Sequence, residues 1–192
     1  MTFSKIEHFK DQVIGLRPVY TNTGNATEIF LDSGNIIVDG RGLKSVIKAF
    51  ARSFAIDLKA QRVMLGDWIQ RRSLMPFFVG KNRVFIPLKM RQTITANDAS
   101  NGYLDVNYIS EIKEAEKKRC LLLLTNGITC EVFSNRNTII QNQHLGLSLL
   151  EMLEDPGKES EEENLIVNSA RIIARTLGKM SKQLDNIEGK IT

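Results

Sequence analysis

The sequence predicts an α+β domain of largely antiparallel hairpins and packed helices, followed by a long C-terminal helix. Short β-branched and aromatic runs alternate with turn signals such as Asp32-Ser33-Gly34-Asn35 and Asn126-Gly127, which are typical of hairpins. Elsewhere, apolar residues recur every three or four positions, as they do on the buried face of a helix. With 192 residues and 42% hydrophobic content, the chain is long and apolar enough to bury a core.

The first half of the chain is expected to form three strands and two helices. The strand signals lie at residues 12–20, 27–31 and 35–40. The first helix is expected because apolar residues from Leu43 to Phe54 recur at helical spacing. Asp57 can cap a second helix that extends to about Arg71. The apolar arc of this second helix, expected to face the core, consists of Leu58, Met64, Leu65, Trp68 and Ile69.

The second half is expected to hold two further hairpins and a helix. The first hairpin spans residues 75–88, with Gly80-Lys81-Asn82 at its tip. Residues 103–112 are expected to form one strand. The second hairpin turns at Asn126-Gly127, and residues 135–153 carry a helical pattern.

Residues 1–153 are therefore expected to form the folded domain. An acidic linker follows at 154–163, and residues 164–192 are expected to form the C-terminal helix. Ser160 and Glu163 have the spacing of a capping box in front of it. Apolar residues alternate at spacings of four and three along this helix, so it either self-associates or packs on its own domain.

The two cysteines, Cys120 and Cys130, are expected to be buried and reduced. A two-residue turn would pair residue 123 with Cys130, and side chains alternate along a strand, so the two thiols would face opposite sides of the sheet. This arrangement argues against a disulfide. The chain has only His8 and His144 as histidines, and no set of cysteines and histidines has the spacing of a zinc site.

Catalytic motifs are not found in the sequence. Gly40-Arg41-Gly42 begins like a dinucleotide-binding loop, but Ser45 stands where a third glycine is required, and Gly80-Lys81 is followed by Asn82 instead of serine or threonine. We therefore expect no enzyme, no cofactor and no metal. No apolar run approaches the roughly 18 residues that span a bilayer, so we expect a cytoplasmic protein without a membrane partner.

Positive charge is concentrated between Arg41 and Arg91. This block contains twelve lysine or arginine residues and only Asp57 and Asp67 as acids, a net charge of +10, whereas the whole chain carries +4. The rest of the chain therefore carries −6. A surface built only for solubility mixes the two signs. The block therefore predicts a polyanionic partner.

Duplex DNA is the expected polyanion, because it carries one charge per roughly 1.7 Å of axis and needs spaced cations more than any motif. Phe50, Phe54 and Trp68 lie on apolar helical arcs and are expected in the core, which favours duplex DNA over stacking on single strands. Arg83, near the hairpin tip, could probe a narrow minor groove. The predicted DNA-binding residues are Lys44, Lys48, Arg52, Lys59, Arg62, Arg71, Arg72, Lys81, Arg83, Lys89 and Arg91.

The order of segments resembles the ComK family, the competence transcription factors of Gram-positive bacteria with A/T-rich genomes. The resemblance extends from about Val13 to Leu150, and rests on the strand VIGLRPVY, the helix end AFARSF, the basic helix LKAQRV, the hairpin LMPFFVGKNRVFIPL, the segment NGYLDVNYI and a TNG turn. The chain departs from the family pattern at Tyr103, at Gly146 and at Ala51-Arg52-Ser53-Phe54, where the family cysteine is absent.

The resemblance implies a transcriptional activator that binds A/T-rich boxes upstream of genes for DNA uptake, as more than one subunit. It also implies control by proteolysis through an adaptor protein. A second hypothesis stays open from the residues alone. In this alternative, the chain is a protein-interaction module whose basic face docks an acidic partner and whose C-terminal helix self-associates.

Overall fold

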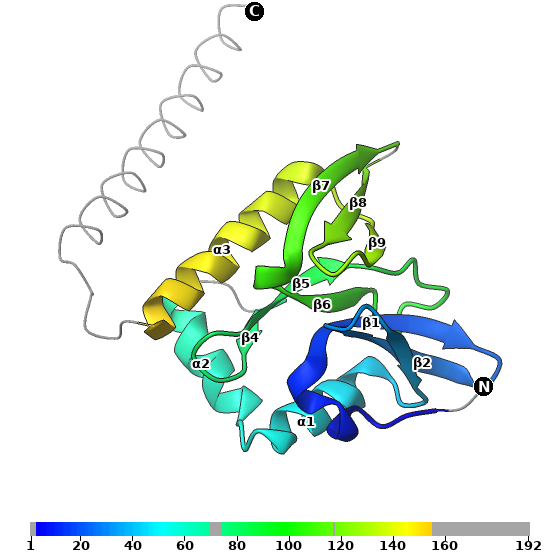
Figure 1. Cartoon of the computed structure of the whole chain (residues 1–192), viewed down its shortest axis with the longest axis horizontal. Coiled ribbons are helices and arrows are strands. Elements are labelled where there is room, and N and C mark those ends of the chain that lie inside the picture. Colours follow the sequence, from blue (N-terminus) through cyan, green and yellow to red (C-terminus); the bar gives the residue numbers. More distant parts are fainter. Residues whose placement is uncertain (1–2, 70–73, 117, 155–192) are drawn as a thin grey trace, which may run out of the picture. The chain divides into compact units, whose positions relative to one another are not determined.

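The computed structural model describes residues 3–69, 74–116 and 118–154. This part of the chain is an α+β domain, which confirms the fold class predicted from the sequence (Figure 1). Its larger sheet is antiparallel and has the strand order β3-β2-β1-β6-β5-β4. The strands are β1 (Val13–Thr21), β2 (Gly24–Leu31), β3 (Ile36–Asp39), β4 (Phe77–Phe78), β5 (Val84–Lys89) and β6 (Asn101–Asp105).

A second antiparallel sheet and several helices complete the described part. The sheet has the order β7-β8-β9, with β7 at Ile109–Ala115, β8 at Arg119–Leu124 and β9 at Thr129–Val132. The α-helices are α1 (Leu43–Ser53), α2 (Leu58–Ile69) and α3 (Arg136–Glu154). Short 3₁₀ turns are η1 (Ile6–His8), η2 (Lys10–Gln12) and η3 (Val106–Tyr108).

The larger sheet lies between two layers. Figure 1 shows α1 and the N-terminal turns on one side of it, and α3 with the β7-β8-β9 sheet on the other. The buried residues divide into two clusters accordingly. In the cluster beneath α1, Phe50 meets Phe54 and Phe85 edge-on, with ring centroids 5.4 Å apart in each pair. This aromatic packing holds α1 on the sheet.

The hairpin of β8 and β9 has a different register from the prediction. Its loop holds residues 125–127, and the last of these is a glycine with a φ of +86°. This loop is one residue longer than the predicted turn, so Leu122 pairs with Cys130. Cys120 therefore lies on the same buried side as Cys130, and the prediction of opposite faces was wrong. Both thiols are free, and burial raises the pKa of Cys130 to about 11.

Residues 103–112, predicted as one strand, belong to two sheets. β6 ends at Asp105, whose side chain accepts the backbone N–H of Asn107 at 3.2 Å. This local bond offers the backbone an alternative to the strand ladder and begins the turn η3. β7 then starts at Ile109 and pairs with β8. The prediction missed this change of sheet.

Helix α2 is less buried than its apolar pattern predicts. Asp57 caps it as expected, because its carboxylate accepts the backbone N–H of Lys59 at 2.8 Å. Leu65 is fully buried, but Met64 is 47% exposed and Trp68 is 41% exposed. The helix touches the core along a narrow line only. The prediction that its whole apolar arc, including Trp68, faces the core was therefore wrong.

Two predicted segments lie outside the described residues. They are the acidic linker beyond Glu154 and the C-terminal helix predicted at 164–192. Among the helices that the structure does describe, none combines the length and the apolarity that a membrane crossing requires.

Candidate nucleic-acid interface

A stripe of positive charge runs along the exposed side of α1. Lys44, Lys48 and Arg52 are exposed, whereas Val46 and Phe50 on the opposite side are fully buried. Helices rise about 1.5 Å per residue, so these charges follow one another at about 6 Å along the axis. Within the described part of the chain, none of the three has an ion-pair partner. The stripe therefore presents three uncompensated charges.

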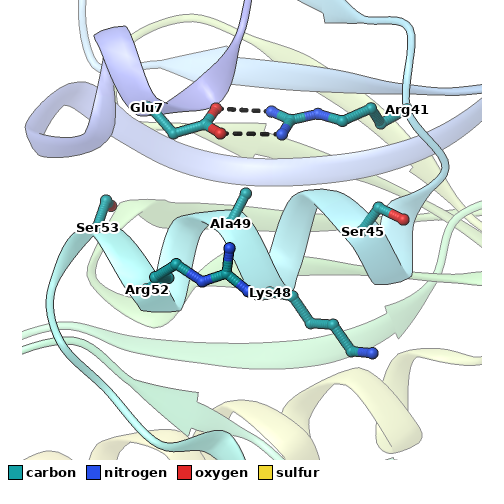
Figure 2. Close-up of a pocket in the computed structure, with 7 residues that line it drawn as sticks. All are labelled: Glu7, Arg41, Ser45, Lys48, Ala49, Arg52 and Ser53. Atoms are coloured by element: carbon teal, nitrogen blue, oxygen red, sulfur yellow. Dashed lines mark hydrogen bonds and ion pairs between the residues drawn. The ribbon is translucent and has the colours of Figure 1, made fainter.

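A groove of about 370 Å³ lies beside this stripe, between α1 and the N-terminal segment (Figure 2). Three small residues spaced one helical turn apart, Ser45, Ala49 and Ser53, line its α1 wall and leave the space open. Lys48 and Arg52 border the same wall from the exposed side. We call this the α1 groove; its lining residues are Glu7, Arg41, Ser45, Lys48, Ala49, Arg52 and Ser53.

The opposite wall of the α1 groove is an ion-pair network centred on Arg41. Its guanidinium donates from Nη1 to Glu7 Oε1 at 2.9 Å and from Nη2 to Glu7 Oε2 at 2.6 Å (Figure 2). It also donates from Nε to Asp39 Oδ1 at 2.9 Å. The buried Asp39 accepts the backbone N–H of Ile6 at 3.1 Å as well. The network thus ties the N-terminal segment to the end of β3.

These bonds keep both carboxyl groups ionised. The hydrogen bonds from Arg41 lower the pKa of Glu7 from 4.5 to about 2. Burial pushes the pKa of Asp39 upward, but hydrogen bonds from Arg41 and from the backbone outweigh this effect and lower it. The two carboxylates in turn raise the pKa of Arg41, Asp39 more than Glu7. One guanidinium is therefore shared between two carboxylates at neutral pH.

A further cation, Lys10, lies at the Ser53 end of the α1 groove. Its Nζ donates to the carbonyl oxygen of Ser53 at 3.2 Å and lies 4.9 Å from the ring centroid of Phe54. A lysine at this position favourably meets the negative end of the α1 dipole. It links the end of α1 to η2 and adds positive charge near the groove.

The basic surface continues on α2, which follows α1 after a short connection. Lys59 and Arg62 are exposed on its first two turns. Burial raises the pKa of Tyr103, and the nearby positive charge of Arg62 partly offsets this rise. Tyr103 packs against Phe77, with ring centroids 5.1 Å apart, in the cluster beneath α1. Gln61, next to Arg62, exchanges hydrogen bonds with the backbone of Phe78, which places this part of α2 beside the edge strand β4.

Arg83 and Arg91 are engaged inside the fold, which corrects their expected role as DNA contacts. Arg83 does not extend from the hairpin tip. Its Nε pairs with the buried Asp105 at 3.2 Å, and its guanidinium donates to the carbonyl oxygen of Val13. Arg91 is 7% exposed, and its guanidinium carbon lies 4.1 Å from the ring centroid of Tyr20. Neither guanidinium is therefore available to a duplex.

Two other predicted residues, Lys81 and Lys89, belong to neither α1 nor α2. Lys81 is exposed between β4 and β5, and Lys89 is exposed at the far end of β5. A strand of this length extends over about 17 Å. Arg71 and Arg72 lie outside the described residues. The structure thus places five predicted cations on two consecutive helices, and it places Lys81 and Lys89 on the β4–β5 loop and at the end of β5.

The α1 groove itself was not identified from the sequence. Glu7 and Arg41 are 34 positions apart and meet only because β3 returns beside the N-terminal turn. No local pattern links them. The helical spacing of Ser45, Ala49 and Ser53 was the available signal, since three small residues in a row on one side of a helix leave room for another group.

A second hollow, of about 410 Å³, lies near the end of β1 and suits an anion less well. Arg17 and Arg91 border it. Arg17 pairs with Glu28, and Arg91 donates to the side chain of Asn25 at 2.8 Å. Both guanidinium groups therefore already have partners, unlike the cations of the α1 stripe.

Comparisons with protein-family models, with curated proteins and with solved structures found no match for this chain.

Proposed function

We propose that this chain is a DNA-binding transcriptional activator that holds duplex DNA through α1 and the first two turns of α2. The stripe of Lys44, Lys48 and Arg52 carries the proposal, because it is exposed and has no ion-pair partner among the described residues. Contacts to phosphates supply most of the sequence-independent affinity of a protein for DNA. Val46 and Phe50 anchor the helix, so the charges stand on a rigid element.

The preference for A/T-rich sites and the control of DNA-uptake genes come from the resemblance to the ComK family. Narrow A/T-rich minor grooves concentrate negative potential, which suits a basic protein. The same resemblance supports binding as more than one subunit and regulation through an adaptor protein. These parts of the proposal concern the target and the partners and remain predictions.

Fluorescence anisotropy with an A/T-rich duplex and a G/C-rich duplex of equal length tests the proposal. The wild type is expected to prefer the A/T-rich duplex. A double variant, Lys44→Gln with Lys48→Gln, is expected to bind about a hundredfold more weakly at low salt, because two phosphate contacts of about tenfold each are lost. Its melting temperature should change little, since both side chains are exposed and unpaired with any described residue.

The matched control is the double variant Lys113→Gln with Lys118→Gln. It removes the same charge from exposed positions of β7 and the following turn, on the other side of the large sheet. Its affinity should stay within about twofold of the wild type. Equal losses in both variants would reject the α1 interface. Absence of binding at low salt would reject DNA binding itself, and equal affinity for both duplexes would reject the A/T preference.

A protein-interaction module is the second candidate, because α2 exposes apolar side chains next to its cations. Val63 is 70% exposed and lies between Arg62 and Met64 in the chain. An acidic partner with apolar side chains would cover both features, as the cores and rims of protein interfaces do. This function would be favoured if the chain binds an acidic amphipathic peptide in a salt-sensitive way and Val63→Ser loses that binding. The chain would also have to show no binding to DNA.

A further inference from the structure

We propose that the α1 groove is a phosphate-binding site that holds one backbone phosphate of the DNA duplex. The inference rests on the proposed function, because it names the place where one phosphate of that duplex is held. It goes beyond a general basic surface, since it assigns the contact to a hollow with a defined shape and with hydrogen-bond donors along one wall.

The α1 wall offers the donors that a phosphate requires. Lys48 and Arg52 border the groove, and neither is paired with a described residue. Lysine supplies three N–H donors, and the guanidinium of arginine supplies a planar fork that matches two phosphate oxygens. The hydroxyl of Ser45 can donate a further hydrogen bond from the same wall. Charge-assisted bonds of this kind are the stronger class in proteins.

The shape of the groove is set before any ligand arrives. Its α1 wall belongs to a helix that Phe50 anchors in the core. The facing wall is held by Arg41, which Asp39 fixes at the end of β3. Ala49 lies between the two serines on this wall and adds a small apolar group to it. A site with both walls fixed loses little conformational freedom when a phosphate binds.

Glu7 limits the affinity of this site. Its carboxylate lies on the groove wall, where it repels an anion and occupies Nη1 of Arg41. Arg41 remains attached to Asp39 through Nε when Glu7 is neutralised. The groove wall would then carry no negative charge at this position to repel a phosphate. Neutralising Glu7 is therefore expected to tighten binding.

A groove-filling variant tests the site without changing the charge. Ser45→Leu places a larger apolar side chain in the groove, and Ser148→Leu makes the same exchange at an exposed position of α3, on the other side of the large sheet. Lys48→Gln is a second groove variant, and it still tests the site if Ser45→Leu fails to fold. Melting temperatures are recorded for all variants. Binding of the full chain to an A/T-rich duplex is measured by anisotropy at several salt concentrations.

Ser45→Leu and Lys48→Gln are expected to weaken DNA binding about tenfold and to reduce the salt slope by about 1, as the loss of one phosphate contact should. Ser148→Leu should stay within about twofold of the wild type, and Glu7→Gln should bind about threefold more tightly with a steeper salt slope. If Ser45→Leu and Ser148→Leu both bind DNA with the same affinity as the wild type, the groove site is overturned. The proposed function would still hold.

Sodium pyrophosphate distinguishes a free phosphate compound from the DNA backbone. One outcome is that pyrophosphate raises the melting temperature of the wild type but not of Ser45→Leu, and that neither protein binds the duplex. The groove would then bind a free phosphate compound. That outcome would overturn both the DNA source and the proposed function. The inference is supported if pyrophosphate displaces the duplex from the wild type but not from Ser45→Leu.

Discussion

Arg41 connects two carboxylates that differ in their exposure to solvent. The side chain of Asp39 is 3% exposed and that of Glu7 is 38% exposed. The contact with Asp39 is therefore the structural one, because an unpaired charge at that depth would be costly. The contact with Glu7 resembles a surface ion pair, which contributes about 0–1 kcal/mol. Glu7 can thus be exchanged without unfolding the N-terminal segment.

The pairing of Glu7 predicts a pH dependence of stability. Its pKa is about 2 in the folded protein and 4.5 in the unfolded chain, so the folded state binds its proton less readily. The stabilisation is present above pH 4.5 and is lost as the pH falls toward 2. The difference in unfolding free energy between the wild type and Glu7→Gln should therefore shrink over this range. Chemical unfolding at a series of pH values checks this, and a difference that persists at pH 2 would contradict it.

Arg83 is predicted to matter for stability instead of DNA binding. Its partner Asp105 has a side chain that is 1% exposed, and burial already raises the pKa of that carboxyl group. Arg83→Ala would remove the ion-pair partner of the buried Asp105 and should cost about 3–5 kcal/mol of unfolding free energy. The exposed neighbour Lys81 is the control, and Lys81→Ala should cost less than about 0.5 kcal/mol. Urea unfolding measures both. Equal effects would show that the ion pair contributes nothing.

At the scale of elements, α3 approaches the large sheet through Gly146. A Cβ at this position would lie 2.6 Å from Ile86 Cγ2 and 3.3 Å from Val106 Cβ. Helix and sheet are therefore packed too closely for any side chain here. This contact explains why a glycine stands in the middle of a helix, where alanine would be favoured by about 1 kcal/mol.

Two glycine variants separate close packing from helix propensity. Gly146→Ala should lower the unfolding free energy by about 1–3 kcal/mol, because the added methyl group overpacks the contact with β5. Gly66→Ala in α2 meets nothing within 4 Å and should raise it by up to about 1 kcal/mol. Thermal unfolding of both variants measures the signs. Stabilisation in Gly146→Ala would contradict the close approach of α3.

Helices α1 and α2 show how similar patterns lead to different burial. α1 lies on the sheet and buries Leu43, Val46 and Phe50. α2 meets the core mainly through Leu65, and Trp68 stays 41% exposed. A helical period identifies the side that can be buried, but the neighbouring elements determine how much of it they cover.

At the scale of the whole molecule, five cations without an ion-pair partner among the described residues lie on the consecutive helices α1 and α2. The five exposed residues are Lys44, Lys48, Arg52, Lys59 and Arg62. If each neutralises one phosphate, log affinity should fall with log salt at a slope of about −4.5. Removing Lys44 and Lys48 together should reduce the slope to about −2.7. Anisotropy titrations over a range of salt concentrations measure both slopes. An unchanged slope in the double variant would contradict this count.

Local patterns predicted most of the elements. The amphipathic period identified α1, its buried side and its charged side, and the helical period of residues 135–153 predicted α3. Asp57 was correctly predicted as a cap. These features depend on residues within a few positions of one another, so their physical causes are contained in short stretches of sequence.

The sequence by itself determined the α+β class, the concentration of positive charge and the stripe on α1. The tertiary structure decided which cations remain available, since Arg83 and Arg91 meet partners that are distant in the chain. It also decided the register of β8 and β9 and the α1 groove, whose facing wall joins Glu7 to Arg41. Charge and period are properties of the chain, whereas partners and cavities arise only when separate segments pack together.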